Sequence, residues 1–165
     1  MTVTDADIAH LARAVELAGI ALAEGDEPFG SVLVGHDGRV LFEDRNRTKD
    51  GDETRHPEFE IARWAATNVA PADRARSTVY TSGEHCPMCS AAHAWVGLGR
   101  IVYAVSSTQI SGWREAWGMP PGPVAVLPIS AVAPSLAVAG PVARFEHDVK
   151  RMLDESRRRQ RPARP

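Results

Sequence analysis

The chain has 165 residues, 44% of them hydrophobic and 24% charged, which fits one compact domain and excludes a disordered, fibrous or disulfide-stapled protein. Its formal net charge of −2 gives no overall field that would attract nucleic acid or an anionic membrane, although the segment 157–161 is locally basic. The sequence has no run of about 18 apolar residues and no basic leader before an apolar stretch, so we expect a cytoplasmic protein without a membrane span.

The first part of the chain predicts a helix followed by a hairpin. Thr4 and Asp7 form the pattern of a capping box, and apolar residues then recur at helical spacing. Residues 29–35 and 39–43 are short β-prone runs around an Asp-Gly turn, which predicts a hairpin. Residues 44–55 have no apolar periodicity, and we expect them to form a loop above the sheet.

The middle of the chain predicts a strand-helix-strand unit after a second helix. Residues 57–69 place apolar side chains on one helical face. Residues 77–82 and 100–105 are predicted strands, and residues 87–96 between them form a predicted third helix. Lengths of this kind imply a parallel crossover.

The last third of the chain has weaker signals. We expect residues 106–122 to form a long loop, residues 124–129 a fifth strand and residues 141–159 a closing helix. Trp113 and Trp117 lie four residues apart in the expected loop. They form either a lid over a flat ring or an anchor that pins the loop to the surface or to a dimer partner.

The C-terminal segment is rich in arginine. Arg157, Arg158 and Arg159 are interpreted as a solvated helix end, where positive charge suits the helix dipole. Residues 160–165 are predicted to be a disordered tail, which leaves one domain over residues 1–159.

Two short motifs stand at the starts of two predicted helices. They are His56-Pro57-Glu58 and Cys86-Pro87-Met88-Cys89. In each motif the proline takes the first helical position, where its missing N–H costs nothing. The partial positive charge of a helix N-terminus favours the thiolates that zinc requires. We therefore expect one Zn²⁺ ion per chain on His56, Cys86 and Cys89, with the fourth position left for water.

Glu58 is the candidate proton shuttle of this site. It lies two residues from His56, close enough in the chain to reach a metal-bound water without binding the metal. A Cys-X-X-Cys pair alone is also typical of a redox pair or of half a zinc knuckle. A closed structural zinc would need a fourth ligand, and His85 is the one nearby histidine, although its adjacency to Cys86 makes simultaneous coordination awkward.

With these motifs the chain resembles the cytidine and nucleobase deaminase superfamily of zinc enzymes. The likeness extends over about residues 8–105 and includes residues 28–34, Asn46, residues 81–84 and residues 100–104. It looks closest to the branch of bacterial guanine deaminases and tRNA adenosine deaminases. The resemblance implies an α/β fold, a three-layer αβα sandwich around a five-stranded mixed sheet, and a homodimer.

The resemblance also implies a substrate pocket. In that branch the residue matching Asn46 contacts the base, Phe29 shapes the pocket, and the residue before Cys86 and the loop after Tyr103 complete it. Without the resemblance, Phe29 reads as core packing and Asn46 as a turn residue. The candidate substrate-binding residues are Phe29, Asn46, Pro57, Glu84, His85, Gln109 and Trp113.

Three positions depart from the pattern of that branch. His85 replaces the usual proline and Pro57 a common alanine, and neither change removes a ligand or the proton shuttle. Gln109 stands about where guanine deaminases carry an acidic residue. Glutamine both donates and accepts hydrogen bonds. We therefore expect isoguanine, a cytosine analogue or an amino-triazine to be preferred over guanine.

Three functions are compatible with the motifs. They are deamination of a free base, editing of tRNA or DNA by the same chemistry, and a non-enzymatic zinc module. The acidic charge balance opposes the second, because an editor must neutralise several phosphates. Glu58 opposes the third, because a structural site has no use for a non-ligand carboxylate. We expect a hydrolase that releases ammonia from a small heterocyclic base, with guanine deaminase as the alternative.

Overall fold

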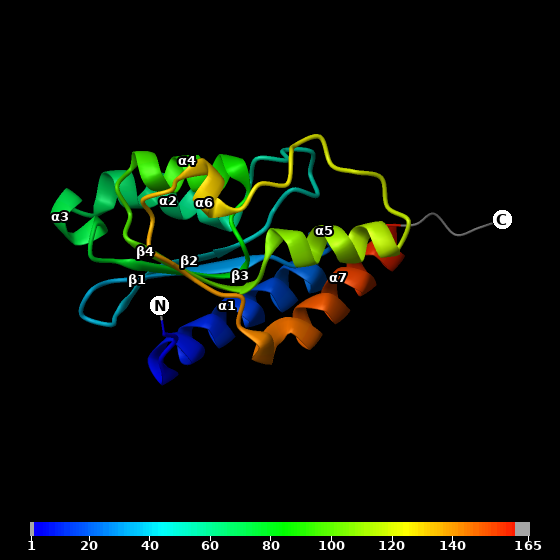
Figure 1. The fold of residues 1–165 in the computed structure, drawn as a ribbon, viewed down its shortest axis with the longest axis horizontal. Coiled ribbons are helices and arrows are strands. Elements are labelled where there is room, and N and C mark those ends of the chain that lie inside the picture. Colours follow the sequence, from blue (N-terminus) through cyan, green and yellow to red (C-terminus); the bar gives the residue numbers. More distant parts are fainter. Residues whose placement is uncertain (1, 161–165) are drawn as a thin grey trace.

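One five-stranded mixed sheet forms the centre of the protein (Figure 1). The computed structural model describes residues 2–160. The strands are β1 (Gly30–Val34), β2 (Val40–Arg45), β3 (Thr78–Gly83), β4 (Arg100–Val105) and β5 (Val138–Ala139). Their order is β2-β1-β3-β4-β5, with β1 antiparallel to β2 and β3, and with β4 parallel to β3 and β5. The predicted hairpin and the predicted parallel crossover are both confirmed.

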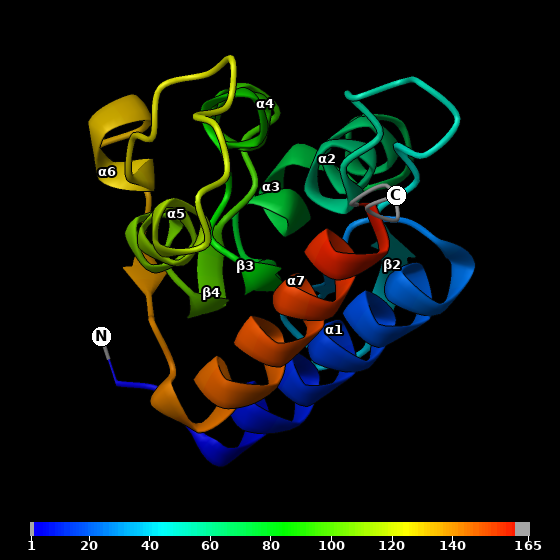
Figure 2. The same ribbon diagram turned by 90° about the vertical axis from the view of Figure 1, so that its right-hand side faces the viewer.

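Helices cover both faces of this sheet. They are α1 (Asp5–Glu24), α2 (Pro57–Asn68), α3 (Pro71–Arg74), α4 (Pro87–Trp95), α5 (Ser107–Ala116), α6 (Ile129–Val132) and α7 (Glu146–Gln160), with a 3₁₀ turn at Ala143–Phe145. In Figure 1, α1 and α7 lie below the sheet, and α2, α3, α4 and α6 lie above it. Figure 2 shows α5 beside the carboxyl end of β4. This arrangement confirms the expected three-layer α/β fold.

The core lies on both faces of the sheet. The larger cluster packs α1 and α7 against the sheet, and the smaller packs α2 and α4 against it. On α1, Leu11, Ala14 and Ala18 are fully buried at helical spacing, whereas Ile8, Ala12 and Val15 are partly buried. Full burial of a leucine side chain contributes about 1.5–3 kcal/mol, so this face alone explains why α1 docks. The expected capping box begins the helix, since the Asp7 N–H donates to Thr4 Oγ1 at 3.2 Å.

The expected loop over residues 106–122 is wrong, because the segment begins with helix α5. Ser106 and Gln109 form a second capping box, in which the Ser106 N–H donates to Gln109 Oε1 at 2.8 Å. Ile110, Trp113 and Trp117 follow at helical spacing and pack toward the larger core cluster. Glycine and proline around the segment are typical of loops, and this apolar spacing outweighs them.

The expected fifth strand at residues 124–129 is also wrong. The fifth strand is β5, which pairs Val138 with Ile101 of β4. Val124 and Val126 are 59% and 53% exposed, and Pro123 precedes them. Proline lacks the N–H that a sheet ladder needs, so an exposed apolar run beside it does not continue the sheet.

The closing helix begins five residues later than expected, at Glu146 rather than at residue 141. The Val142 N–H donates to Ala104 O at 2.9 Å, and this bond holds the chain extended beside β4 until the 3₁₀ turn. Gln160 belongs to α7 rather than to a tail, and residues 161–165 of the expected tail lie outside the described residues. Among the described helices, none is long and apolar enough to cross a membrane.

Candidate active site

Two helix N-termini meet at one point above the sheet. His56 is the N-cap residue of α2 and Cys86 that of α4, and each is followed by a proline in the first turn. The helices α2 and α4 pack against each other, so both N-termini face the same volume. The structure thus brings together the two motifs that the sequence predicts to act jointly.

The ligand atoms of His56, Cys86 and Cys89 form a nearly equilateral triangle. The two sulfurs lie 3.6 Å apart, and His56 Nδ1 lies 3.7 Å from Cys86 Sγ and 3.6 Å from Cys89 Sγ. Tetrahedral zinc, with Zn–S about 2.3 Å and Zn–N about 2.0–2.1 Å, places its ligand atoms about 3.5–3.8 Å apart. Among the described residues, the ligand atoms of these three side chains lie close enough together to hold one metal ion. The donor set therefore fits zinc.

The protonation of the metal-free cluster is uneven. A hydrogen bond from the Cys89 thiol and the neighbouring His56 lower the pKa of Cys86 to about 4. The same hydrogen bond, together with burial, raises the pKa of Cys89. Contact with the Cys86 sulfur raises the pKa of His56. Zinc binding requires both sulfurs as thiolates, so it must release the proton that the raised pKa favours on Cys89.

Glu58 stands beside the triangle as a buried carboxyl group. Its side chain is 6% exposed, and its Oε2 lies 3.7 Å from Cys89 Sγ. Its other oxygen, Oε1, accepts a hydrogen bond of 2.8 Å from the Thr81 hydroxyl. Burial raises the pKa of Glu58, which suits a group that must hold and release a proton near neutral pH.

Thr81 and Ser31 are site residues that the sequence analysis missed. Both are fully buried, and they face each other in the pairing of β1 with β3. The Ser31 hydroxyl donates to Thr81 Oγ1 at 2.9 Å, which leaves the Thr81 proton for Glu58. A sequence signal exists for Ser31, the one hydroxyl residue of the otherwise apolar β1, whereas Thr81 shares β3 with Thr78 and Ser82 and does not stand out.

A backbone hydrogen bond joins Asn46 to Phe29. The Asn46 N–H donates to Phe29 O at 2.9 Å, and Asn46 itself is 1% exposed. Asn46 Nδ2 donates to Thr48 Oγ1, whereas Oδ1 is buried without a hydrogen-bond partner in the described part of the chain. The Phe29 ring packs over Gly83, where an added Cβ would come within 3.0 Å of Phe29 Cε1. An unpaired buried acceptor beside an aromatic ring suits a polar flat ligand.

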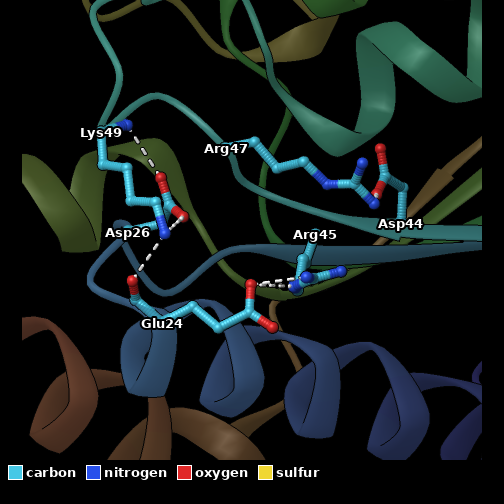
Figure 3. A network of polar contacts seen from close by, with 6 residues as sticks. All are labelled: Glu24, Asp26, Asp44, Arg45, Arg47 and Lys49. Atoms are coloured by element: carbon cyan, nitrogen blue, oxygen red, sulfur yellow. Dashed lines mark hydrogen bonds and ion pairs between the residues drawn. The ribbon is translucent and has the colours of Figure 1, made fainter.

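Polar contacts hold the loop that follows Asn46 to the end of α1 (Figure 3). The buried Asp26 carboxylate accepts from the Lys49 backbone N–H at 2.8 Å, and Lys49 Nζ donates to Glu24 O at 2.8 Å. Arg45 pairs with the Glu24 carboxylate, and Figure 3 shows these groups converging between α1 and the loop. The ends of the short segment that carries Asn46 are therefore fixed.

Three other candidate pocket residues have their polar atoms engaged or buried. Glu84 Oε2 accepts from the Ser107 N–H at 2.8 Å and its Oε1 from the Ile129 N–H at 3.0 Å, so Glu84 joins the metal-binding turn to the starts of α5 and α6. Gln109 uses its amide oxygen in the capping box of α5. His85 is 1% exposed, lies outside the metal triangle and packs against the His93 ring with centroids 5.3 Å apart.

The two tryptophans anchor α5 on α7. Lys150 Nζ lies 5.5 Å from the centre of the Trp113 ring, and the Arg157 guanidinium lies 5.4 Å from that of Trp117. Both rings are partly buried against the larger core cluster. These contacts fit the anchor among the alternatives left open by the sequence, and they join α5 to α7 of the same chain. Pro57 is buried in the first turn of α2 and shapes the helix start.

Comparisons with known proteins agree with this geometry. Residues 4–105 match the family described as the cytidine and deoxycytidylate deaminase zinc-binding region. A probable cytosine deaminase of Schizosaccharomyces pombe is 33% identical over 107 residues, which make up 65% of this chain and 65% of that protein. The guanine deaminase of Bacillus subtilis is 37% identical over 102 residues, 60% of this chain and 64% of that protein. The matched stretch thus spans less than two thirds of each of these two relatives.

The fold is also found among solved structures. The guanine deaminase from Nitrosomonas europaea superposes with a TM-score of 0.68 at 20% identity, covering 94% of this chain and 86% of that chain. At this identity the likeness concerns the fold. The family match covers both motifs of the metal triangle and Glu58, but ends before α5.

Proposed function

Since the chain belongs to the family of cytidine and deoxycytidylate deaminase zinc-binding domains, we propose that it is a zinc-dependent hydrolase that removes an amino group from a free nucleobase or a similar amino-heterocycle. The observation that supports this proposal most strongly is the position of Glu58. Its buried carboxyl group lies 3.7 Å from Cys89 Sγ, beside the three proposed zinc ligands, and is not itself one of them. A structural zinc site has no use for such a group. We do not propose a redox pair for Cys86 and Cys89, because both sulfurs are ligands in the proposed zinc site.

The proposed mechanism is a hydrolytic exchange of an amino group for oxygen. Bound zinc would supply Lewis acidity that makes a water molecule more acidic. Glu58 takes a proton from this water as its oxygen bonds to the amino-bearing ring carbon, and passes the proton to the adjacent ring nitrogen. Glu58 then takes a second proton from the hydroxyl group now bonded to this carbon and transfers it to the amino group, so that the C–N bond breaks, ammonia leaves and the carbonyl forms. Thr81 holds Glu58 at the reacting carbon throughout.

The proposed substrate pocket surrounds this proton shuttle. We assign Phe29 to stacking on the ring, and the unpaired Asn46 Oδ1 to accepting a ring N–H. Pro57 contributes to the pocket wall. Glu84, His85, Gln109 and Trp113 are assigned to holding the surrounding elements, because their polar or aromatic groups already have partners or are buried within the chain.

The proposed substrates are free bases and base analogues such as isoguanine, a cytosine analogue or an amino-triazine, with guanine as the alternative. The names of the relatives, a probable cytosine deaminase and a guanine deaminase, support a free base. Binding of tRNA or DNA is disfavoured, because Arg157 and Arg158 pair with Asp154, and Arg159 pairs with Glu155. The basic end of α7 is thus largely neutralised within the helix.

A second copy of the chain is the proposed partner. A groove of about 640 Å³ lies beside α2 and α4, and its apolar wall includes Phe42, Trp64 and Val96. Trp95, on the same face, is 88% exposed. A two-fold dimer brings one patch against itself, so a projecting tryptophan and a groove on the same face are self-complementary. Analytical ultracentrifugation should show a dimer that Trp95→Lys converts to monomer; a monomeric unmodified protein at micromolar concentration contradicts this.

The experiment that tests the proposed activity measures ammonia release from a substrate panel. The panel contains guanine, isoguanine, cytosine, 5-azacytosine, ammeline and the matching nucleosides. We expect kcat/KM to be highest for a free base or triazine other than guanine, and nucleosides to react poorly. A preference for guanine would select the alternative substrate, and ammonia from none of the free bases would overturn the proposed activity.

A further inference from the structure

An ion pair joins the segment before β1 to α5. Glu27 Oε1 and Arg114 Nη2 form an ion pair of 2.6 Å. Phe29 and Ile110 both lie against Gly83, where an added Cβ would come within 3.0 Å of Phe29 Cε1 and 3.3 Å of Ile110 Cδ1. Ile110 and Arg114 are four residues apart, so they share one face of α5. The ion pair therefore lies one helical turn along α5 from Ile110.

These contacts place Glu27 at the edge of the active site. Gly83 ends β3, three residues before the ligand Cys86, and Phe29 shares a backbone hydrogen bond with Asn46. Glu27 thus lies two residues from Phe29, and its backbone oxygen accepts a hydrogen bond of 2.9 Å from the Phe29 N–H.

Glu27 keeps capacity to bind a further group. Its side chain is 34% exposed, and that of Arg114 is 33% exposed. Only Oε1 has a recorded partner in the described residues, so Oε2 can accept hydrogen bonds from a ligand. Gln109 is a weaker candidate for this role, because its amide is neutral and its oxygen already accepts from the Ser106 N–H.

We propose that Glu27, oriented by Arg114, is a specificity-determining residue that accepts N–H donors from the substrate edge remote from the reacting carbon. A carboxylate oxygen favours an edge on which a second amino group adjoins the ring nitrogens, and rejects a carbonyl there through repulsion between acceptors. The preferred substrates are then diamino-heterocycles. This inference rests on the proposed deaminase function and narrows its substrate class.

Two triazines provide a matched pair for the test. Ammeline and 5-azacytosine have the same ring and the same reacting amino group, and differ in that ammeline carries a second amino group. We expect the unmodified protein to have the higher kcat/KM for ammeline. Glu27→Gln should lower the ratio of kcat/KM for ammeline over 5-azacytosine about tenfold, because a hydrogen bond to a charged acceptor is replaced by a neutral one. Arg114→Met should lower the same ratio by less.

A matched control separates recognition from the general effect of losing a surface ion pair. Glu43 pairs with Arg13 at the far side of β1 and has a similar exposure of 36%, so Glu43→Gln should leave the ratio unchanged. If Glu27→Gln lowers kcat/KM equally for both triazines, Glu27 acts by positioning α5 and the inference is wrong. Turnover of other bases but of neither triazine also overturns the inference and leaves the deaminase function standing. Ammonia from no base at all overturns both.

Discussion

The Thr81 hydroxyl donates a hydrogen bond of 2.8 Å to Oε1 of Glu58, and it does so from the centre of the buried sheet. Thr81 Oγ1 accepts the hydroxyl proton of Ser31, so the hydroxyl proton of Thr81 itself is directed at Glu58. The sheet therefore fixes the orientation of the carboxyl group that is proposed to move protons.

Thr81→Val should lower kcat about tenfold with little change in KM, because it removes a hydrogen bond to a carboxylate while keeping the shape of the side chain. Ser31→Ala, one contact further away, should lower kcat by less. Steady-state kinetics and zinc content, measured on both variants, check this. A Thr81→Val enzyme with unchanged kcat and full zinc would show that Glu58 is held by other groups.

Metal removal should affect the fold as well as the activity. Cys86→Ala removes one corner of the triangle, so the variant should bind less than one zinc per chain, lose activity and melt about 5 °C or more below the unmodified protein. Elemental analysis and thermal melting provide the measurement. Two zinc ions per chain in the unmodified protein, or full zinc in Cys86→Ala, would be at odds with a three-ligand site.

Asp26→Ala should weaken substrate binding without removing zinc. The buried carboxylate accepts the Lys49 N–H, and its loss leaves that donor unpaired and frees the loop that carries Asn46. We expect KM to rise several-fold and the Lys49 amide to exchange faster with deuterium. Asp26→Asn, which keeps an acceptor oxygen, should largely restore both values. An unchanged KM together with faster exchange would separate the loop from substrate binding.

Acid stability should depend on Asp7. Burial acts to raise the pKa of Asp7, but hydrogen bonds from Thr4, Tyr80 and Arg100 outweigh it, and the net pKa is lower than the usual 3.8. A lowered pKa in the folded state contributes stability above pH 3.8, and this contribution is lost as pH falls through the folded-state pKa. Asp7→Asn should therefore unfold more easily in urea at pH 7, and the difference from the unmodified protein should shrink below about pH 4. A pH-independent difference would contradict this linkage.

The N-terminal two thirds of the fold could be predicted because local signals and packing agree there. The Thr4 capping box, the Asp-Gly turn and the two Pro-started helices each have a local physical cause, and tertiary contacts reinforce them. The metal triangle followed from the same motifs. Beyond β4 the agreement ends, since α5 depends on a capping box between Ser106 and Gln109 and on packing against α7.

The substrate pocket could be predicted only in part. Asn46 and Phe29 followed from the resemblance to deaminases, and the structure places them next to each other. Thr81 and Glu27 could not be identified, because their importance depends on contacts between residues 23 and 87 positions apart. For Gln109, whose sequence position predicts a ligand contact, the structure adds a second role, because its amide oxygen caps α5.

The most direct test of the proposed deaminase function compares ammonia release by the zinc-loaded protein and by its Glu58→Gln variant on the best free base of the panel. The amide keeps the shape of the side chain but cannot transfer protons, so we expect full zinc content, an unchanged melting temperature and a fall in kcat of about 10²-fold or more. Deamination by Glu58→Gln at close to the unmodified rate would contradict the role of Glu58 on which the account depends.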